Sequence, residues 1–396
     1  RTIHLYLSLA AGIVIFCSCL TGTMLVFEKE IEHTLHPERY EINPQNDRLP
    51  VAQLAQSALK QHPKARLATV MIYNNPSQTV EIGLIVPEKK KQEHKPALGK
   101  KEQPKGGAKD KGKYVARPNL TVFVNPYTGQ VTGEYNRRQS FLYTVEMLHR
   151  FLLAGKDSAG DVIVGICTLL FLFILITGII LWWPKTKAVM KQRLKIKWDG
   201  STKRLVHDLH LVTGFYTSLF LVVIVLTGLV MSFTWANKAL FALTGSAFVK
   251  EQPKAPQSTL LPHAKSITVD DALKALSGKI STLQYVTVRM PKDSASSYSI
   301  VVLPVHAIET AADTYFVDQY TGSIVGSQLF AGKSLGQRVR SFVKPVHTGS
   351  VYGLPTKIIS FVVCSLSLIF PVTGVMMWLN RIRKKKKKPV AKMQLV

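Results

Sequence analysis

Four apolar, uncharged stretches constrain the fold of this chain more than any other feature of its sequence. Each is long enough to cross a bilayer core of about 30 Å at about 1.5 Å of helical rise per residue. They run from Leu5 to Phe27, from Val162 to Trp183, from Leu211 to Ala236 and from Ile358 to Asn380. The sequence therefore predicts an α-helical integral membrane protein with four transmembrane helices.

Basic residues gather beside these stretches in one of the three connections, between the second and third stretches, and at the C-terminus. Residues 185–204 carry eight basic residues and one acidic residue, and residues 381–392 carry eight basic residues and no acidic one. Lysine and arginine mark the cytoplasmic ends of membrane helices. We therefore expect both termini in the cytoplasm and two long exported segments. The net charge of +27 does not indicate nucleic-acid binding, because no soluble module presents an ordered basic surface.

The expected division of the chain repeats one order twice: a membrane helix, an exported module and a second membrane helix. We interpret the first apolar stretch as a retained helix, since it is longer than a signal-peptide core. The predicted membrane helices are 2–28, 160–184, 207–236 and 353–380, the exported modules are 29–150 and 237–347, and the cytoplasmic parts are the loop 185–206 and the tail 381–396.

The two exported segments are each expected to fold as a small α+β module. Each begins with an amphipathic helix, continues with three alternating strands and ends on a tight turn that holds the letters Y-T-G. The predicted helices are 51–61 and 270–276, and the predicted strands are 66–74, 78–86 and 119–125, then 282–290, 297–303 and 314–318. The repeated order predicts two pseudo-twofold repeats. A flexible basic insert is expected at 88–113.

Four histidines stand at equivalent places in these two repeats. His4 precedes Thr21 and Gly22 by 17 residues, and His210 precedes Thr227 and Gly228 by the same 17. His149 and His347 each follow an exported module and precede a membrane helix with its own Thr-Gly pair. If the repeats pack around an axis along the membrane normal, His4 faces His210 and His149 faces His347.

Two opposed imidazoles in apolar helices suit the two axial positions of a haem iron. We predict two haems, each held by a histidine pair, with His207 as an alternative to His210. The absence of a C-x-x-C-H motif means that both would be non-covalent b-type haems. Zinc or copper is less well supported, because no carboxylate or thiolate accompanies the histidines at ligand spacing.

Basic residues beside the histidines are candidates to bind the haem propionates, since arginine matches a carboxylate with two hydrogen bonds. Arg150 is the first candidate for the exported side and Arg204, with Lys203, for the cytoplasmic side. Further candidates on the exported side are Arg137, Arg138, Arg338, Arg340 and Lys344.

Several motifs resemble the PepSY-associated transmembrane family, which includes PiuB-type iron-regulated membrane proteins. They are IHLYLSLAAG, DLHLVTG, VNPYTGQVTGE, VDQYTGSIVGSQ, EMLHRFLLAG, VHTGSVYGLP and the four Thr-Gly pairs. Some members resemble ferric-siderophore reductases of the bacterial inner membrane. The resemblance implies PepSY-like exported modules, two b-type haems between four helices, and a ferric siderophore of the hydroxamate type as electron acceptor.

Two other functions remain open at this stage. The exported modules are alternatively a peptide-binding or protease-regulating domain without redox activity, which leaves the paired histidines unexplained. Electrons alternatively pass to a quinone or to a periplasmic reductase partner. No dinucleotide-binding or flavin domain occurs in the sequence, so the electron donor is a separate, unidentified molecule.

Overall fold

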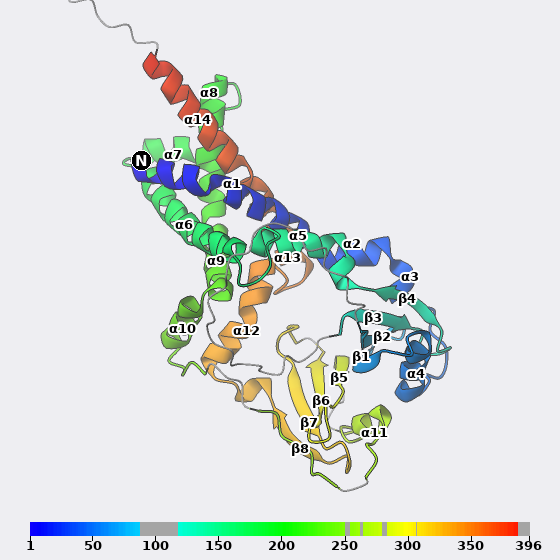
Figure 1. Cartoon of the computed structure of the whole chain (residues 1–396). Helices are drawn as coiled ribbons and strands as arrows, with labels where there is room; N and C mark the ends of the chain where they lie inside the picture. The colour runs from blue at the N-terminus through cyan, green and yellow to red at the C-terminus, as the bar shows by residue number, and fades with distance from the viewer. Residues whose placement is uncertain (88–117, 250–253, 262–263, 279–282, 306, 387–396) are drawn as a thin grey trace, which may run out of the picture.

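The computed structural model describes residues 1–87, 118–249, 254–261, 264–278, 283–305 and 307–386. The expected insert 88–113 therefore lies wholly outside the described residues. The described chain forms a helical bundle at one end and an eight-stranded sheet at the other (Figure 1). Both the N-terminus and the last described turn of the chain lie at the end of the bundle that is remote from the sheet (Figure 1).

Four helical segments of the bundle are long and apolar enough to cross a membrane. The first two are continuous helices, α1 (Thr2–Leu25) and α6 (Ala159–Trp182). The third joins α8 (Thr202–Asp208), a π-helical turn (Leu209–Thr213) and α9 (Gly214–Ser232). The fourth is divided at Leu368 into α13 (Leu354–Ser367) and α14 (Ile369–Lys386). The division lies one turn before Pro371, which has no N–H to donate to the preceding turn.

Shorter helices connect these segments to the sheet and to one another. α5 (Phe141–Phe151) packs against α1 and α6, and α12 (Leu335–Thr348) packs against α9. Each follows a short 3₁₀ turn after the last strand of its half. The remaining short helices are α2 (Glu28–Leu35), α3 (Pro37–Tyr40), α7 (Lys187–Arg193) and α10 (Thr234–Leu243).

The sheet is antiparallel throughout and contains both halves of the chain, in the order β4-β3-β2-β1-β5-β6-β7-β8. The strands of the first half are β1 (Arg66–Tyr73), β2 (Val80–Ile85), β3 (Leu120–Val124) and β4 (Val131–Tyr135). Those of the second half are β5 (Leu283–Arg289), β6 (Tyr298–Pro304), β7 (Asp313–Val317) and β8 (Ile324–Gln328). The expectation of three strands in each module was wrong, because each Y-T-G turn leads into a fourth strand.

Pairing between β1 and β5 joins the two modules into one sheet. Val70 lies opposite Val288, and Tyr73 lies opposite Tyr285. Because side chains alternate along a strand, the two valines point to one face and the two tyrosines to the other. We call this β1–β5 pairing the seam.

One face of the sheet is covered by α4 (Val51–Gln61) and α11 (Val269–Lys274). α4 has the predicted bounds, and α11 begins and ends slightly before the predicted 270–276. Leu54 and Ala58 of α4 are buried against Val70 and Ile82, and Ala272 of α11 belongs to the equivalent cluster of the second half. Burying such side chains contributes roughly 1.5–3 kcal/mol each. The opposite face of the sheet, which carries Tyr73 and Tyr285, is therefore left for other contacts.

Candidate functional site

The four predicted histidines lie in two facing pairs at different levels of the bundle. His149 on α5 and His347 on α12 have ring centroids 6.2 Å apart, and we call them the sheet-side pair. His4 on α1 and His210 in the π-helical turn have ring centroids 6.5 Å apart, and we call them the tail-side pair. Each pair takes one histidine from each half of the chain.

Helix ends fix the sheet-side pair in place. Ser140 caps α5 by accepting from the backbone N–H of Tyr143, and Ser334 forms a reciprocal capping box with Gln337 at the start of α12. α12 stops at Gly349, whose φ of 74° is the left-handed conformation that glycine adopts without strain. The two histidines therefore occupy the last turn of two defined helices.

Each histidine contacts the threonine of a Thr-Gly pair that belongs to a different helix. Every one of these contacts joins the ring atom Nδ1 to the threonine Oγ1. The distances are 3.0 Å for His4 and Thr177, 2.8 Å for His210 and Thr373, 3.1 Å for His149 and Thr21, and 3.1 Å for His347 and Thr227. The four Thr-Gly pairs are thus the partners of the four histidines.

The threonine contacts determine which ring nitrogen carries the proton. Each threonine hydroxyl also lies within 2.7–2.9 Å of the carbonyl oxygen four residues earlier in its own helix, where only the hydroxyl can donate. Its oxygen is then left to accept from Nδ1–H of the histidine. His149 and His347 confirm this direction, because their Nδ1 atoms also lie 2.9 Å from the backbone carbonyls of Ser18 and Ile224. In the neutral ring, Nε2 therefore keeps a free lone pair.

Burial keeps the sheet-side pair neutral. Burial, with a smaller contribution from His347, lowers the pKa of His149 to about 4, and burial lowers the pKa of His347. Neutral imidazole is the form that coordinates a metal. Both residues are on α5 and α12, outside the four candidate membrane spans.

The glycine of each Thr-Gly pair lets an imidazole approach the helix closely. A Cβ atom at Gly22 or Gly228 would lie 3.3 Å from Cε1 of His149 or His347, which is closer than most Cβ contacts. At Gly178 the distance to His4 would be 3.4 Å, and at Gly374 the distance to His210 would be an ordinary 3.8 Å. Glycine is thus required most at the sheet-side pair.

The π-helical turn places His210 and distinguishes it from His207. Such turns insert one extra residue into a helix and often mark functional sites. The ring of His210 contacts that of His4. The side chain of His207 is instead 53% exposed, and its Nδ1 lies 3.3 Å from Oδ1 of Asp208. The structure therefore gives the facing position to His210, which the 17-residue spacing also favours.

Three of the arginines predicted to bind haem propionates already form ion pairs with acidic side chains. Nη1 of Arg150 lies 3.1 Å from Glu146, and Nε of Arg204 lies 2.7 Å from the buried carboxylate of Asp208. Arg137 likewise contacts Glu28 and Glu146. A further anion at Arg150 or Arg204 has to share the arginine with these partners.

Arg340 is the better placed of the predicted cations. It lies seven residues, or two helical turns, before His347 on the same face of α12. Burial lowers the pKa of its guanidinium, and among the described residues it has no carboxylate within ion-pair distance. An arginine that is partly desolvated and lacks a partner can accept a carboxylate ligand.

Trp182 is a further residue of the tail-side region that sequence spacing does not indicate. It lies one turn after Gly178 and stacks on Phe215 at 3.7 Å between ring centroids, and its buried Nε1 has no hydrogen-bond partner among the described residues. A buried indole N–H without an acceptor is unusual. A tryptophan at the end of a span is typical of the membrane interface, and the burial of one edge of Trp182 depends on packing between α6 and α9, which the sequence does not specify.

Each histidine pair offers two ligands for one metal ion and no more. No group of three or more His, Cys, Asp or Glu side chains with metal-binding geometry occurs in the part of the chain that the structure describes. A structural zinc site needs four such ligands. Two imidazoles that bind one metal from opposite sides, each through an Nε2–metal bond of about 2 Å, have ring centroids about 6 Å apart. The observed pairs have this separation.

The chain was also compared with known proteins. Residues 1–381 match a protein-family model described as the PepSY-associated TM region. The chain belongs to this family. The match covers both histidine pairs, all four Thr-Gly pairs and the whole sheet. A comparison with curated proteins finds no match.

Proposed function

We propose that this PepSY-associated membrane protein is a two-haem oxidoreductase that moves electrons across the bilayer to a ferric siderophore. The observation that carries the proposal is the repeated arrangement of facing histidines. Each donates its Nδ1–H to a threonine hydroxyl, which leaves the lone pair of Nε2 for a metal. Such second-shell hydrogen bonds orient metal-binding imidazoles and fix their tautomer. Four repetitions of one detail are difficult to explain by interfacial histidines that act singly.

The residues around each pair fit a b-type haem. His149 and His347 would bind the sheet-side haem, and His4 and His210 the tail-side haem. Arg340 and the Nε1–H of Trp182, which have no ion-pair or hydrogen-bond partner in the part of the chain that the structure describes, are suitable donors to propionates at the two levels. Haem with two imidazole ligands exchanges single electrons, and the apolar helices around it exclude water.

Two levels of histidines divide the distance that an electron has to cross. On α1, His4 and Thr21, the partner of His149, are 17 residues apart, or roughly 26 Å along the helix. The same spacing separates His210 and Thr227 on the third span. Two haem groups, one at each level, would break one long transfer into shorter steps.

The acceptor is expected on the sheet side. The basic loop and tail at the other end of the bundle follow the distribution of cytoplasmic charges, which supports an inner-membrane protein with an exported sheet. Reduction of Fe(III) to Fe(II) weakens its binding to hard oxygen ligands, so one electron releases the metal without hydrolysis. The resemblance to ferric-siderophore reductases within the family supports a hydroxamate siderophore as the acceptor. The electron donor would be a separate molecule.

The proposal predicts a protein that purifies with about two haems per chain. We expect His149→Ala and His347→Ala each to remove the same haem, and His4→Ala and His210→Ala each to remove the other, because a haem with one remaining axial ligand is held weakly. Haem content and reduced-minus-oxidised absorption spectra of the four variants measure this. His62→Ala, which removes a histidine paired with Glu134 on the sheet, is the matched control.

The acceptor is tested with the dithionite-reduced protein in a stopped-flow instrument. A ferric trihydroxamate should reoxidise the haems, whereas its gallium complex should not, because gallium(III) has similar charge and size but takes up no electron. A folded, colourless protein from haem-replete cells would contradict the proposal and favour a peptide-binding module. Haems that are reoxidised by quinone or a partner protein but by no ferric siderophore would contradict only the acceptor.

A further inference from the structure

A cavity of about 660 Å³ lies at the seam between the two halves of the sheet. Its lining includes Met71 and Tyr73 of β1, Tyr285 of β5 and Leu303 of β6. The rings of Tyr73 and Tyr285 meet edge to face at 6.1 Å between centroids. These side chains are on the face of the sheet that α4 and α11 do not cover. The cavity is therefore built jointly by both repeats.

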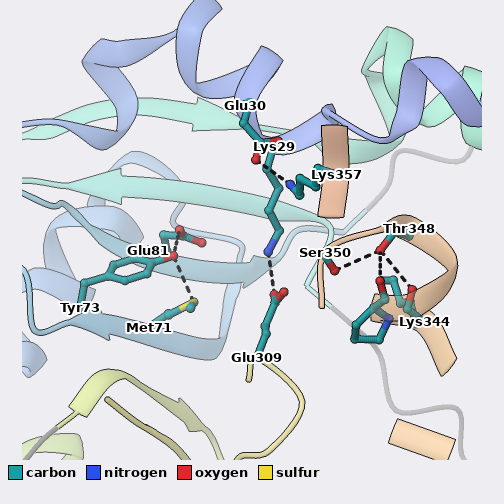
Figure 2. Close-up of polar contacts among 11 residues, drawn as sticks. Lys29, Glu30, Met71, Tyr73, Glu81, Glu309, Lys344, Thr348, Ser350 and Lys357 are labelled. Carbon is teal, nitrogen blue, oxygen red and sulfur yellow. Dashed lines mark hydrogen bonds and ion pairs between the residues drawn. The ribbon is translucent and has the colours of Figure 1, made fainter. Parts of the chain in front are cut away.

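A charged side chain of helix α2 forms an ion pair beside this face of the sheet. Nζ of Lys29, at the start of α2, lies 2.6 Å from Glu309 in the loop after β6, and both residues line the cavity. Figure 2 shows Lys29 reaching from its helix to Glu309, with Tyr73 and Glu81 to one side. Lys344, three residues before His347, is also near enough to lower the pKa of Glu309. A cation on the helix that carries a sheet-side histidine thus interacts electrostatically with one wall of the cavity.

Glu81 lies behind Tyr73 and is largely shielded from solvent. The Oη atom of Tyr73 is 2.6 Å from Oε1 of Glu81 and 3.5 Å from the sulfur of Met71. Tyr73 lines the cavity, whereas Glu81 is on the adjacent strand β2. A hydrogen-bonded chain therefore leads from the cavity through a phenol to a carboxyl group.

The surroundings of Glu81 stabilise its protonated form more than water does for an exposed glutamate. Burial raises the pKa of Glu81, against the opposing effects of its hydrogen bond from Tyr73 and of His33 and Lys29 on α2. The phenol of Tyr40 on α3 also faces it, and Phe123 of β3 lies opposite it in the sheet. Burial likewise raises the pKa of Tyr73. Neither group readily becomes an isolated anion.

We propose that Tyr73 and Glu81 form a proton-donating wall of the seam cavity, which protonates an oxygen of the acceptor as that acceptor is reduced. This inference rests on the proposed function. Iron(III) gains one electron supplied across the bundle, and an Fe–O bond to the chelate breaks. The released oxyanion takes the proton of the Tyr73 hydroxyl, and Tyr73 takes one from Glu81. The carboxylate of Glu81 then recovers a proton from solvent.

The test follows reoxidation of the reduced full-length protein by a ferric trihydroxamate chelate as a function of pH. In the unaltered protein the rate constant should fall as pH rises through the raised pKa of Glu81, because the donor form is lost. Glu81→Gln and Tyr73→Phe should each slow reoxidation about tenfold or more and flatten the pH profile, within the range of general-acid effects. Glu134→Gln, an exposed acid on β4, should leave both unchanged.

Binding and folding are measured in the same variants. The dissociation constant of the gallium chelate should stay within about twofold in Glu81→Gln and Tyr73→Phe, since only the proton step is removed. Thermal unfolding and haem spectra show whether each variant is folded, and Tyr73→Phe provides the test if Glu81→Gln is not. Unchanged rates, or gallium binding that weakens in parallel with the rate, would overturn the inference alone. Failure of every ferric chelate to reoxidise the unaltered protein would overturn the proposed function and the inference together.

Discussion

At the residue scale, the Thr-Gly pairs are the clearest example of what the sequence does and does not reveal. The four Thr-Gly pairs can be recognised in the sequence by their repetition, but the sequence does not indicate that they contact the histidines. Thr177 contacts His4 from 173 positions away, and Thr21 contacts His149 from 128 positions away. Spacing along one helix cannot predict which other helix packs against it. The partner of each histidine is therefore a property of the assembled bundle.

The glycines of these pairs allow a matched test. Gly228→Ala would place a methyl group 3.3 Å from His347, whereas Gly374→Ala would place one 3.8 Å from His210. Both changes favour the helix by about 1 kcal/mol. A difference between the effects of the two variants therefore reports the contact of the new methyl group with the imidazole ring. We expect Gly228→Ala to shift the spectrum or midpoint potential of the haem proposed at the sheet-side pair, and Gly374→Ala to leave the haem proposed at the tail-side pair nearly unchanged. Equal effects on both haems would contradict the close-contact argument.

At the scale of elements, hydropathy and alternation predicted the four spans, α4 and six of the eight strands of the described sheet. β4 and β8 were missed because each has five residues with a glycine near its middle, VTGEY and IVGSQ, which weakens the strand signal. The Y-T-G turns contained the missing information, since a tight turn at a strand end commonly leads to a returning strand. α5 and α12, which hold the sheet-side pair, were likewise not predicted as separate helices.

The π-helical turn qualifies the argument from equal spacing. His4 and His210 are both 17 residues before a Thr-Gly pair, but only the second interval contains the extra residue of a π turn. One residue corresponds to a rotation of about 100° around an α-helix. Equal spacing therefore does not mean equal direction, and the facing of these rings depends on the turn.

A deletion tests this dependence. Removing Leu211 would convert the π turn to regular α-helix and rotate His210 relative to α9 by about 100°. If the proposed haems are bound, we expect loss of the one at the tail-side pair and retention of the one at the sheet-side pair, whose proposed ligands are on α5 and α12. Haem content and low-temperature absorption spectra measure both. Replacement of Leu211 by alanine, which keeps the chain length, is the control and should retain both haems.

At the scale of the whole molecule, the two halves are joined more extensively than two modules on separate anchors would be. The β1–β5 seam makes one sheet, and two ion pairs tie α2 to the second half. These are Lys29 with Glu309 and Glu30 with Lys357, each at 2.6 Å (Figure 2). The repeated order of elements was predictable from the sequence. The seam was not, because both modules have similar strands and nothing local specifies which edges pair.

A further link between the halves gives the last prediction. α4 begins after Pro50, which has no side-chain cap, and its first two N–H groups are instead bound by a residue of α11. Oδ1 and Oδ2 of Asp270 lie 2.8 and 2.9 Å from the backbone nitrogens of Val51 and Ala52. A carboxylate at a helix N-terminus satisfies unpaired donors and interacts favourably with the helix dipole. Asp270 thus caps a helix of the other half.

Asp270→Ala should lower the free energy of unfolding by about 1–2 kcal/mol, the usual cost of losing an N-cap. Because the seam makes one sheet, hydrogen-exchange protection should fall in β1 and in β5 together, not in the first half alone. Thermal unfolding with peptide-resolved exchange measures both quantities. Asp271→Asn is the matched control, since Asp271 caps only its own helix with Thr268. Loss of protection confined to α4 and β1 would show that the halves open independently and that the seam is not a cooperative link.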